Sequence, residues 1–89
     1  MESQDNKELM EYMVRNLKSE MRKREVKFRY NKKNGELREA LGTLNSEIYG
    51  KENEPNGTGK FVPENQVRYY DLNSQGWRSF IAENLIDFE

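Results

Sequence analysis

The feature that most constrains the fold is a change of hydrophobic period near residue 25. Before it, apolar side chains recur three and four residues apart, as on one face of a helix, at Met10, Val14, Leu17 and Met21 with Leu9 and Met13 beside them. After it they recur at every second residue, as in a strand with one buried face, at Val26, Phe28 and Tyr30. We therefore predict an amphipathic helix over residues 7–23 followed by a strand.

The pair Asn34-Gly35 then predicts a hairpin whose second strand covers residues 36–44. A loop with an even number of residues would place Leu37, Leu41 and Thr43 beside the aromatic side chains of the first strand, and Lys27, Arg29 and Arg38 together on the other face. A three-residue bulged loop would instead place Ala40, Gly42 and Leu44 beside the aromatic side chains. The sequence leaves both registers open.

The rest of the chain predicts a long loop and three more strands. Residues 45–66 contain both prolines and three of the six glycines without a sustained period, which is typical of an exposed loop. Strands at 67–72 and 77–82 flank the turn 73–76, and a tight turn leads to a last strand at 85–88. We expect an α+β, mainly β fold, with a helix at 1–23 and a half-open five-stranded barrel at 24–89.

The stretch YYDLNSQGWRSF, residues 69–80, contains the only tryptophan. With residues 73–76 as the loop, Leu72 would lie opposite Trp77, Asp71 opposite Arg78 and Tyr69 opposite Phe80. We interpret Asp71 and Arg78 as a structural ion pair that fixes the register, in preference to a phosphate-binding role for the arginine. The other face would hold Arg68 and an apolar surface of Tyr70, Leu72, Trp77 and Ile81. That surface needs a cover, either the N-terminal helix or a partner.

Composition excludes several kinds of chemistry. The chain has no cysteine and no histidine, which removes disulfides, zinc sites built on sulfur or imidazole, and nucleophiles activated by histidine. Nothing in the sequence places the carboxylates of Asp71, Glu39 and Glu83 together in a pocket. We expect a protein that is not an enzyme and that carries no metal and no cofactor.

Charge is uneven along the chain. The formal net charge is −1, but residues 15–38 carry ten Lys and Arg against three acidic residues, a local excess of seven positive charges. No stretch is apolar enough to cross a membrane, and the N-terminus lacks the basic start and apolar run of a signal peptide. We expect a cytoplasmic protein with local attraction to phosphates and no contact with membranes.

Several segments in order carry a family resemblance: VKFRY, KKNG, REALGTLN, YYDL, WRSF and ENLI. Over roughly residues 24–88 the chain resembles a small family described as WYL-like, with an SH3-like or Sm-like barrel, found in Bacteroides-type bacteria and their phages. The resemblance implies an SH3-like (Sm-like) fold for the barrel and an origin in a phage or mobile element. It implies no settled activity.

The leading hypothesis is a small binding module that contacts nucleic acid or a nucleic-acid-handling protein. Bases would stack on aromatic side chains and basic residues would hold phosphates; the candidate residues are Lys27, Arg29, Arg38, Arg68, Tyr70 and Trp77. The alternative is an inhibitory or adaptor protein that docks on a host or phage protein through the helix stripe or the Trp77 face. The Met-rich face of the helix also suggests that copies of the chain could associate as a homo-oligomer.

Overall fold

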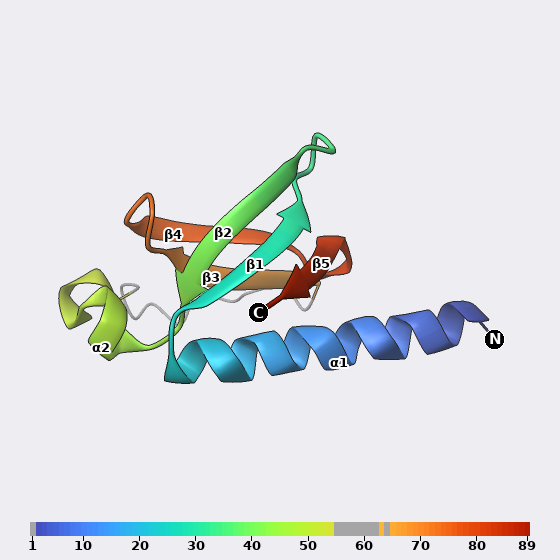
Figure 1. Ribbon diagram of the computed structural model, residues 1–89, viewed down its shortest axis with the longest axis horizontal. Coiled ribbons are helices and arrows are strands. Elements are labelled where there is room, and N and C mark those ends of the chain that lie inside the picture. The colour runs from blue at the N-terminus through green and yellow to red at the C-terminus, as the bar shows by residue number, and fades with distance from the viewer. Residues whose placement is uncertain (1, 55–62, 64) are drawn as a thin grey trace.

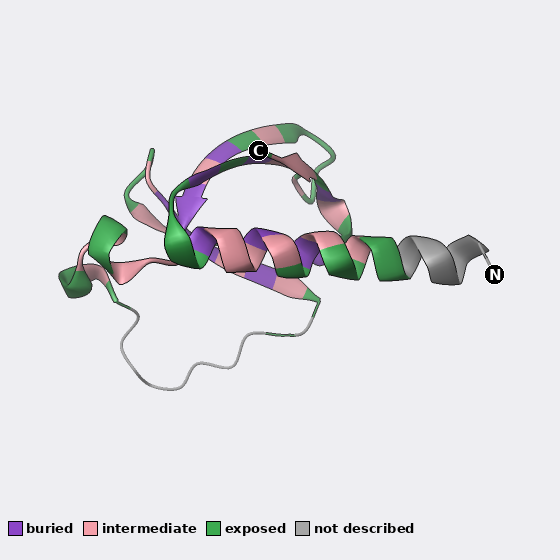
Figure 2. Cartoon of the chain, turned by 60° about the horizontal axis from the view of Figure 1, so that its bottom comes forward, coloured by how far each residue is buried: buried purple, intermediate pink, exposed green. Residues whose placement is uncertain are grey.

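The computed structural model describes residues 2–54, 63 and 65–89, and the side chains of the first helix from Glu8 onward. The helix α1 (Glu2–Lys23) is followed by five strands: β1 (Val26–Asn31), β2 (Leu37–Thr43), β3 (Gln66–Asp71), β4 (Gly76–Ile81) and β5 (Leu85–Phe88). All paired strands are antiparallel, and their order in the sheet is β4-β3-β2-β1-β5. The sheet curls over α1, which lies along the long axis of the molecule (Figures 1 and 2). The predicted α+β fold with a half-open barrel is therefore confirmed.

The helix begins at Glu2, earlier than the predicted residue 7, and ends at the predicted Lys23. Its buried residues are Val14, Leu17 and Met21, which match the predicted stripe and pack against the barrel. The last turn of α1 is bonded to the end of β2, because Leu44 N and Thr43 Oγ1 each donate to Met21 O at 2.9 Å. Helix and barrel therefore share one core.

The first hairpin adopts the three-residue loop. Lys32 N donates to Glu36 O, so the loop is 33–35, and Gly35 has a φ of +90°, a conformation that favours glycine. Phe28 lies opposite Ala40, and Val26 opposite Gly42. The even-loop register is wrong.

One consequence of this register concerns the basic side chains. Arg38 lies opposite Tyr30 on the core face of the sheet, whereas Lys27 and Arg29 lie on the outer face. The even-loop alternative, in which these three residues would share a face, is therefore not the one that the hairpin adopts. The basic segment 15–38 is spread over α1, the hairpin tip and both faces of the hairpin.

The second hairpin keeps its predicted faces with a shifted register. Its closing pair is Asp71 with Gly76, so the four-residue loop is 72–75, and Tyr70 lies opposite Trp77. The predicted partners, Leu72 with Trp77 and Asp71 with Arg78, are wrong by two residues. A shift of two preserves the side of every residue, because side chains alternate with a period of two.

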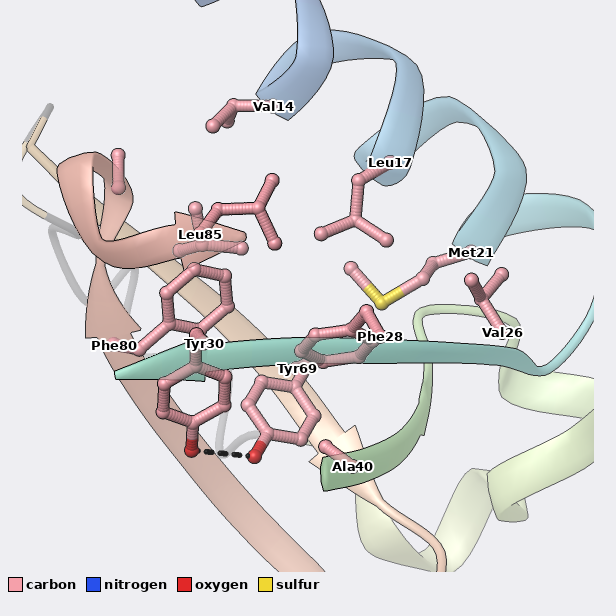
Figure 3. Packing of buried hydrophobic residues seen from close by; sticks show 12 residues of the cluster. Val14, Leu17, Met21, Val26, Phe28, Tyr30, Ala40, Tyr69, Phe80 and Leu85 are labelled. Carbon is pink, nitrogen blue, oxygen red and sulfur yellow. Dashed lines mark hydrogen bonds between the residues drawn. The ribbon is translucent and has the colours of Figure 1, made fainter. Parts of the chain in front are cut away.

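Four aromatic side chains form the centre of the core: Phe28, Tyr30, Tyr69 and Phe80 (Figure 3). The hydroxyls of Tyr30 and Tyr69 lie 2.9 Å apart and share a hydrogen bond, so neither is buried without a partner. A Cβ at Gly42 would lie 2.5 Å from Cδ2 of Tyr69, so only glycine lets this ring pack on β2. The aromatic core thus depends on one backbone position of the sheet.

The predicted loop 45–66 is partly helical where the structure describes it. It contains two short helical segments, α2 (Ser46–Tyr49) and η1 (Lys51–Asn53). The side chain of Asn45 caps α2 by accepting from Glu47 N at 2.9 Å. Residues 55–62 and 64 of the predicted loop lie outside the described residues.

Candidate nucleic-acid interface

The face of β3 and β4 that carries Trp77 is covered by the segment α2–η1. Trp77 Nε1 donates to the carbonyl oxygen of Asn53 at 2.7 Å. The ring of Tyr49 packs against Tyr70 and Trp77, with ring centroids 5.3 and 5.1 Å away. The helix α1 packs against the core on the other side of the sheet. It therefore does not cover the Trp77 face, which was one of the two covers expected from the sequence.

This cover changes what the face can bind. Tyr70 is buried beneath Tyr49, so its ring does not present a stacking surface to solvent. Trp77 is half-buried, and the guanidinium carbon of Arg68 lies 5.0 Å from the centroid of its ring, a cation–π geometry. The three candidate residues Arg68, Tyr70 and Trp77 therefore lie together, but they pack on one another and on α2–η1.

Two other candidates, Lys27 and Arg29, lie on the outer face of β1. Arg29 makes a two-pronged pair with Asp87 on β5, in which Nε donates to Oδ1 at 2.9 Å and Nη2 donates to Oδ2. These hydrogen bonds hold the pKa of Asp87 below its usual value and raise that of Arg29. The positive charge of Arg29 is thus already matched by a neighbouring carboxylate.

The last candidate, Arg38, lines a cleft between the β1–β2 hairpin and β4. Figure 1 shows the directions of the two hairpins. The cleft has a volume of about 400 Å³, within the usual range for ligand sites. One wall is the β1–β2 hairpin, the other is β3–β4, and no carboxylate is among the described side chains that line it. Its basic residues are Lys32, Lys33, Arg38 and Arg78.

A buried carboxylate beneath the cleft orients two of these cations. Asp71 has a side chain only 5% exposed, and its Oδ2 accepts from Arg78 Nε at 2.8 Å and lies 4.0 Å from Arg38 Nη1. Its Oδ1 accepts from the backbone of Asn73 and Ser74 at 2.9 and 3.3 Å. The predicted pair of Asp71 with Arg78 is present, although it is diagonal across the strands. It also organises the turn and the cleft.

Three residues of the cleft were missed by sequence reasoning as binding residues. Lys32 and Lys33 precede the Asn-Gly turn, and a pair of cations at a hairpin tip could have indicated an exposed basic site. For Arg78, the structural pair with Asp71 was preferred over a phosphate-binding role. The structure is compatible with both roles for Arg78, the pair with Asp71 and the binding of an anion. A guanidinium that bonds Asp71 through Nε still has four N–H donors on its two Nη atoms.

Within residues 2–54, 63 and 65–89, no group of three or more acidic residues is placed to hold a metal ion. No helix among those residues has the length and hydropathy needed to span a membrane.

A 22-residue helix packed on a curled five-stranded antiparallel sheet, with a basic cleft between the hairpins, defines a small β-barrel binding module. The chain matches the sequence model of the family described as WYL_2, Sm-like SH3 beta-barrel fold, over residues 14–86, and it belongs to that family. The match begins inside α1, so the family includes the half of the helix that packs on the barrel, which the noted resemblance at 24–88 left out. No curated protein and no solved structure matches the chain.

Proposed function

We propose that the protein is a non-enzymatic module that binds single-stranded nucleic acid, held through its phosphates in the basic cleft. The observation that carries this proposal is the convergence of Lys32, Lys33, Arg38 and Arg78 on one cleft in a chain whose net charge is −1. Positive charge concentrated in a concave site attracts anions even when the whole protein is nearly neutral.

The buried carboxylate strengthens this interpretation. Arg78 is fixed by its bond to Asp71, and the 4.0 Å separation from Asp71 restrains Arg38. A guanidinium already held in place loses less side-chain entropy when it binds a phosphate. The lysines at the hairpin tip supply two further positive charges, and Lys32 also lies 3.5 Å from a carboxylate oxygen of Glu36.

The shape of the cleft favours a single strand. Its apolar wall includes Trp77 and Ile81 of the edge strand β4, against which a sugar or base could pack. The proposed contact is mainly electrostatic, because Tyr70 is buried and Trp77 already packs against Arg68 and Tyr49. We therefore propose little sequence preference and a strong dependence on salt.

The absence of catalysis remains part of the proposal. Asp71 is engaged by two arginines and two backbone amides, Glu39 lies on the outer face near Arg29, and Glu83 lies beside α1. These three carboxylates therefore line different parts of the molecule, and none has the paired arrangement that acid–base chemistry uses. The phage or mobile-element origin stays a prediction from the resemblance.

The alternative function, an adaptor docked on another protein, has less support. The Trp77 face that it would use is occupied by α2–η1. The helix stripe remains open to such a partner only at its N-terminal end, where Leu9 is exposed.

The test is a titration of a fluorescent pyrimidine oligonucleotide of about twelve nucleotides, long enough for one small barrel, followed by anisotropy at low and moderate salt. The double variant Lys32→Gln/Lys33→Gln removes two charges from the cleft without touching Asp71. The matched control, Lys27→Gln/Arg29→Gln, removes two charges from the outer face of the same hairpin.

We expect the cleft variant to bind at least tenfold more weakly than the control at 0.1 M salt, since each lost phosphate contact costs about fivefold. Equal affinities for the two double variants would contradict the site. Binding that is independent of salt would contradict the phosphate contacts, and tighter binding of a duplex would contradict the single-strand assignment.

A further inference from the structure

The burial of the side chains of helix α1 changes along its length. Its C-terminal part buries Val14, Leu17 and Met21 against the barrel, whereas Leu9 and Tyr12 are 67% and 60% exposed. The N-terminal part projects beyond the sheet (Figure 1), and the burial of the helix falls off in that direction (Figure 2). Two large side chains thus lie in water next to the end of the core.

These side chains border an apolar groove. It has a volume of about 550 Å³ and lies between α1, η2 (Ala82–Asn84) and β5. Glu83 is the one charged residue in its described lining, which otherwise consists of Leu9, Met10, Tyr12, Met13, Asn16, Leu85 and Phe88. Exposed apolar side chains beside a groove lined by methionine and phenylalanine form a surface suited to an apolar partner.

Most of the groove residues on α1 are symmetrically spaced. Four of the five, Leu9, Tyr12, Met13 and Asn16, are symmetrical about a point between Tyr12 and Met13, and Met10 is the exception. In an antiparallel pair of helices centred there, Leu9 of one copy would lie beside Asn16 of the other, and Tyr12 beside Met13. Each of these contacts would occur twice, because both copies present the same surface in a twofold interface.

The charges of α1 favour the same orientation. The charged side chains described before Tyr12 are acidic, Glu8 and Glu11. Those after Met13 are mostly basic, with Glu20 the exception among Arg15, Lys18, Arg22 and Lys23. An antiparallel pair places the acidic half of each helix beside the basic half of its partner, whereas a parallel pair places like charges together.

We propose that two copies of this chain associate through this surface, with their α1 helices antiparallel and with Leu9 and Tyr12 of each copy packed into the groove of the other. The interface uses one helix and one short strand from each copy. It is small by the standard of stable complexes, so the dimer is expected to dissociate in the micromolar range.

The first test is sedimentation equilibrium of the full chain, from low micromolar to near-millimolar concentration. The variant Leu9→Asp is expected to stay monomeric where the unmodified chain dimerises, and it should fold because Leu9 is not part of the core. The matched control is Leu37→Asp, which introduces the same charge at a 52% exposed leucine on β2 and should dimerise normally. Equal behaviour of the two variants overturns the proposed surface.

The second test fixes the orientation, using the fact that the chain has no cysteine. A mixture of Leu9→Cys and Asn16→Cys chains should form a mixed disulfide on mild oxidation. Asn16→Cys alone should not, because the two copies of residue 16 would be offset by seven residues, about 10 Å along the helices, beyond the reach of a disulfide.

Self-linking of the Asn16→Cys chain, without the mixed product, would overturn the antiparallel arrangement. An unmodified chain that remains monomeric at all concentrations would overturn the dimer and leave the groove to a different protein.

Discussion

Two regions of the molecule each carry an arginine–aspartate pair, and the pairs differ in how far the carboxylate is buried. On the outer edge of β1 and β5, Arg29 and Asp87 have side chains 43% and 51% exposed. Between β3 and β4, Arg78 is 39% exposed, but Asp71 is only 5% exposed. In the first pair, each side chain neutralises the charge of the other at the surface. The second uses a buried acid to orient an arginine that still faces a cleft.

The comparison teaches that charge alone does not indicate a binding residue in this fold. Arg29 has the more complete ion pair and therefore the least reason to bind a phosphate. Arg78 shares its carboxylate with Arg38, so two positive charges meet one negative charge and an excess of one remains at the cleft. The predictions below test this difference, from the largest expected effect to the smallest.

The largest effect is expected on stability when each aspartate is replaced by alanine. Asp71→Ala removes the partner of Arg78 and the acceptor for the amides of Asn73 and Ser74, and it should lower the free energy of unfolding by about 3 kcal/mol. Asp87→Ala should change it little, because an exposed pair contributes little. Urea unfolding followed by circular dichroism measures both, and similar losses would remove the distinction between the two regions.

The next effect concerns affinity for an oligonucleotide. Arg38→Gln should weaken binding about fivefold at 0.1 M salt, the electrostatic value of one phosphate contact to a single strand. Arg29→Gln should leave affinity within experimental error. Arg38 is the better choice than Arg78 for this test, since the Nε bond from Arg78 to Asp71 would remain and keep the turn intact. A larger loss with Arg29→Gln would move the site to the outer face.

A third prediction concerns alkaline pH and the core beside Asp71. Burial, followed by the hydrogen bond to Tyr30, raises the pKa of Tyr69 well above its usual value. Since the unfolded chain ionises near pH 10, stability from this residue is present below that pH and is lost as the pH rises further. Tyr69→Phe should cost about 1 kcal/mol at neutral pH and should reduce the slope of stability above pH 10.

The measurement is the free energy of unfolding of both proteins between about pH 8 and pH 11, a range that spans the usual tyrosine pKa of about 10. An unchanged slope in Tyr69→Phe would mean that the phenol ionises freely in the folded protein. Tyr12→Phe provides the control, because its side chain is exposed.

The smallest effect is expected from the exposed pair at acid pH. The hydrogen bonds from Arg29 lower the pKa of Asp87, so this pair stabilises the protein above the unfolded pKa of about 4, and the contribution is lost as the pH falls through the folded value. The stability of Asp87→Asn and of the unmodified chain should therefore begin to converge below about pH 4 and become equal once the pH has passed below the lowered pKa of Asp87. A difference that persists beyond that point would show that the asparagine acts through packing.

The fold was largely predictable because its periodicities are strong. The helical stripe from Met10 to Met21 and the alternation at Val26, Phe28 and Tyr30 placed α1 and β1 correctly, and the last strand was predicted with its observed limits. The faces of the second hairpin were also correct despite the register error, since a shift of two residues does not change the side of a residue.

The site was less predictable for three physical reasons. The Asn34-Gly35 turn is compatible with two registers, and only the observed one carries Arg38 to the core face. The cover of Trp77 comes from α2 and η1, which are too short to produce a period. The burial of Asp71 depends on how strongly the sheet curls. Asp71 pairs with Gly42 at the far end of β2, whereas Arg38 lies outside the paired positions of β2 and β3 and meets Asp71 across the bend between the hairpins.

The hydrogen bonds at the end of α1 have a consequence for the order in which the chain folds. The carbonyl oxygen of Met21 receives its donors from Thr43 and Leu44, more than twenty residues later, in place of a local cap. Most of the stability of an amphipathic helix in a protein comes from tertiary packing of its apolar face. During synthesis, α1 therefore cannot reach its final stability until the whole β1–β2 hairpin has emerged, and the helix and this hairpin should form as one cooperative unit, the nucleus on which β3, β4 and β5 assemble.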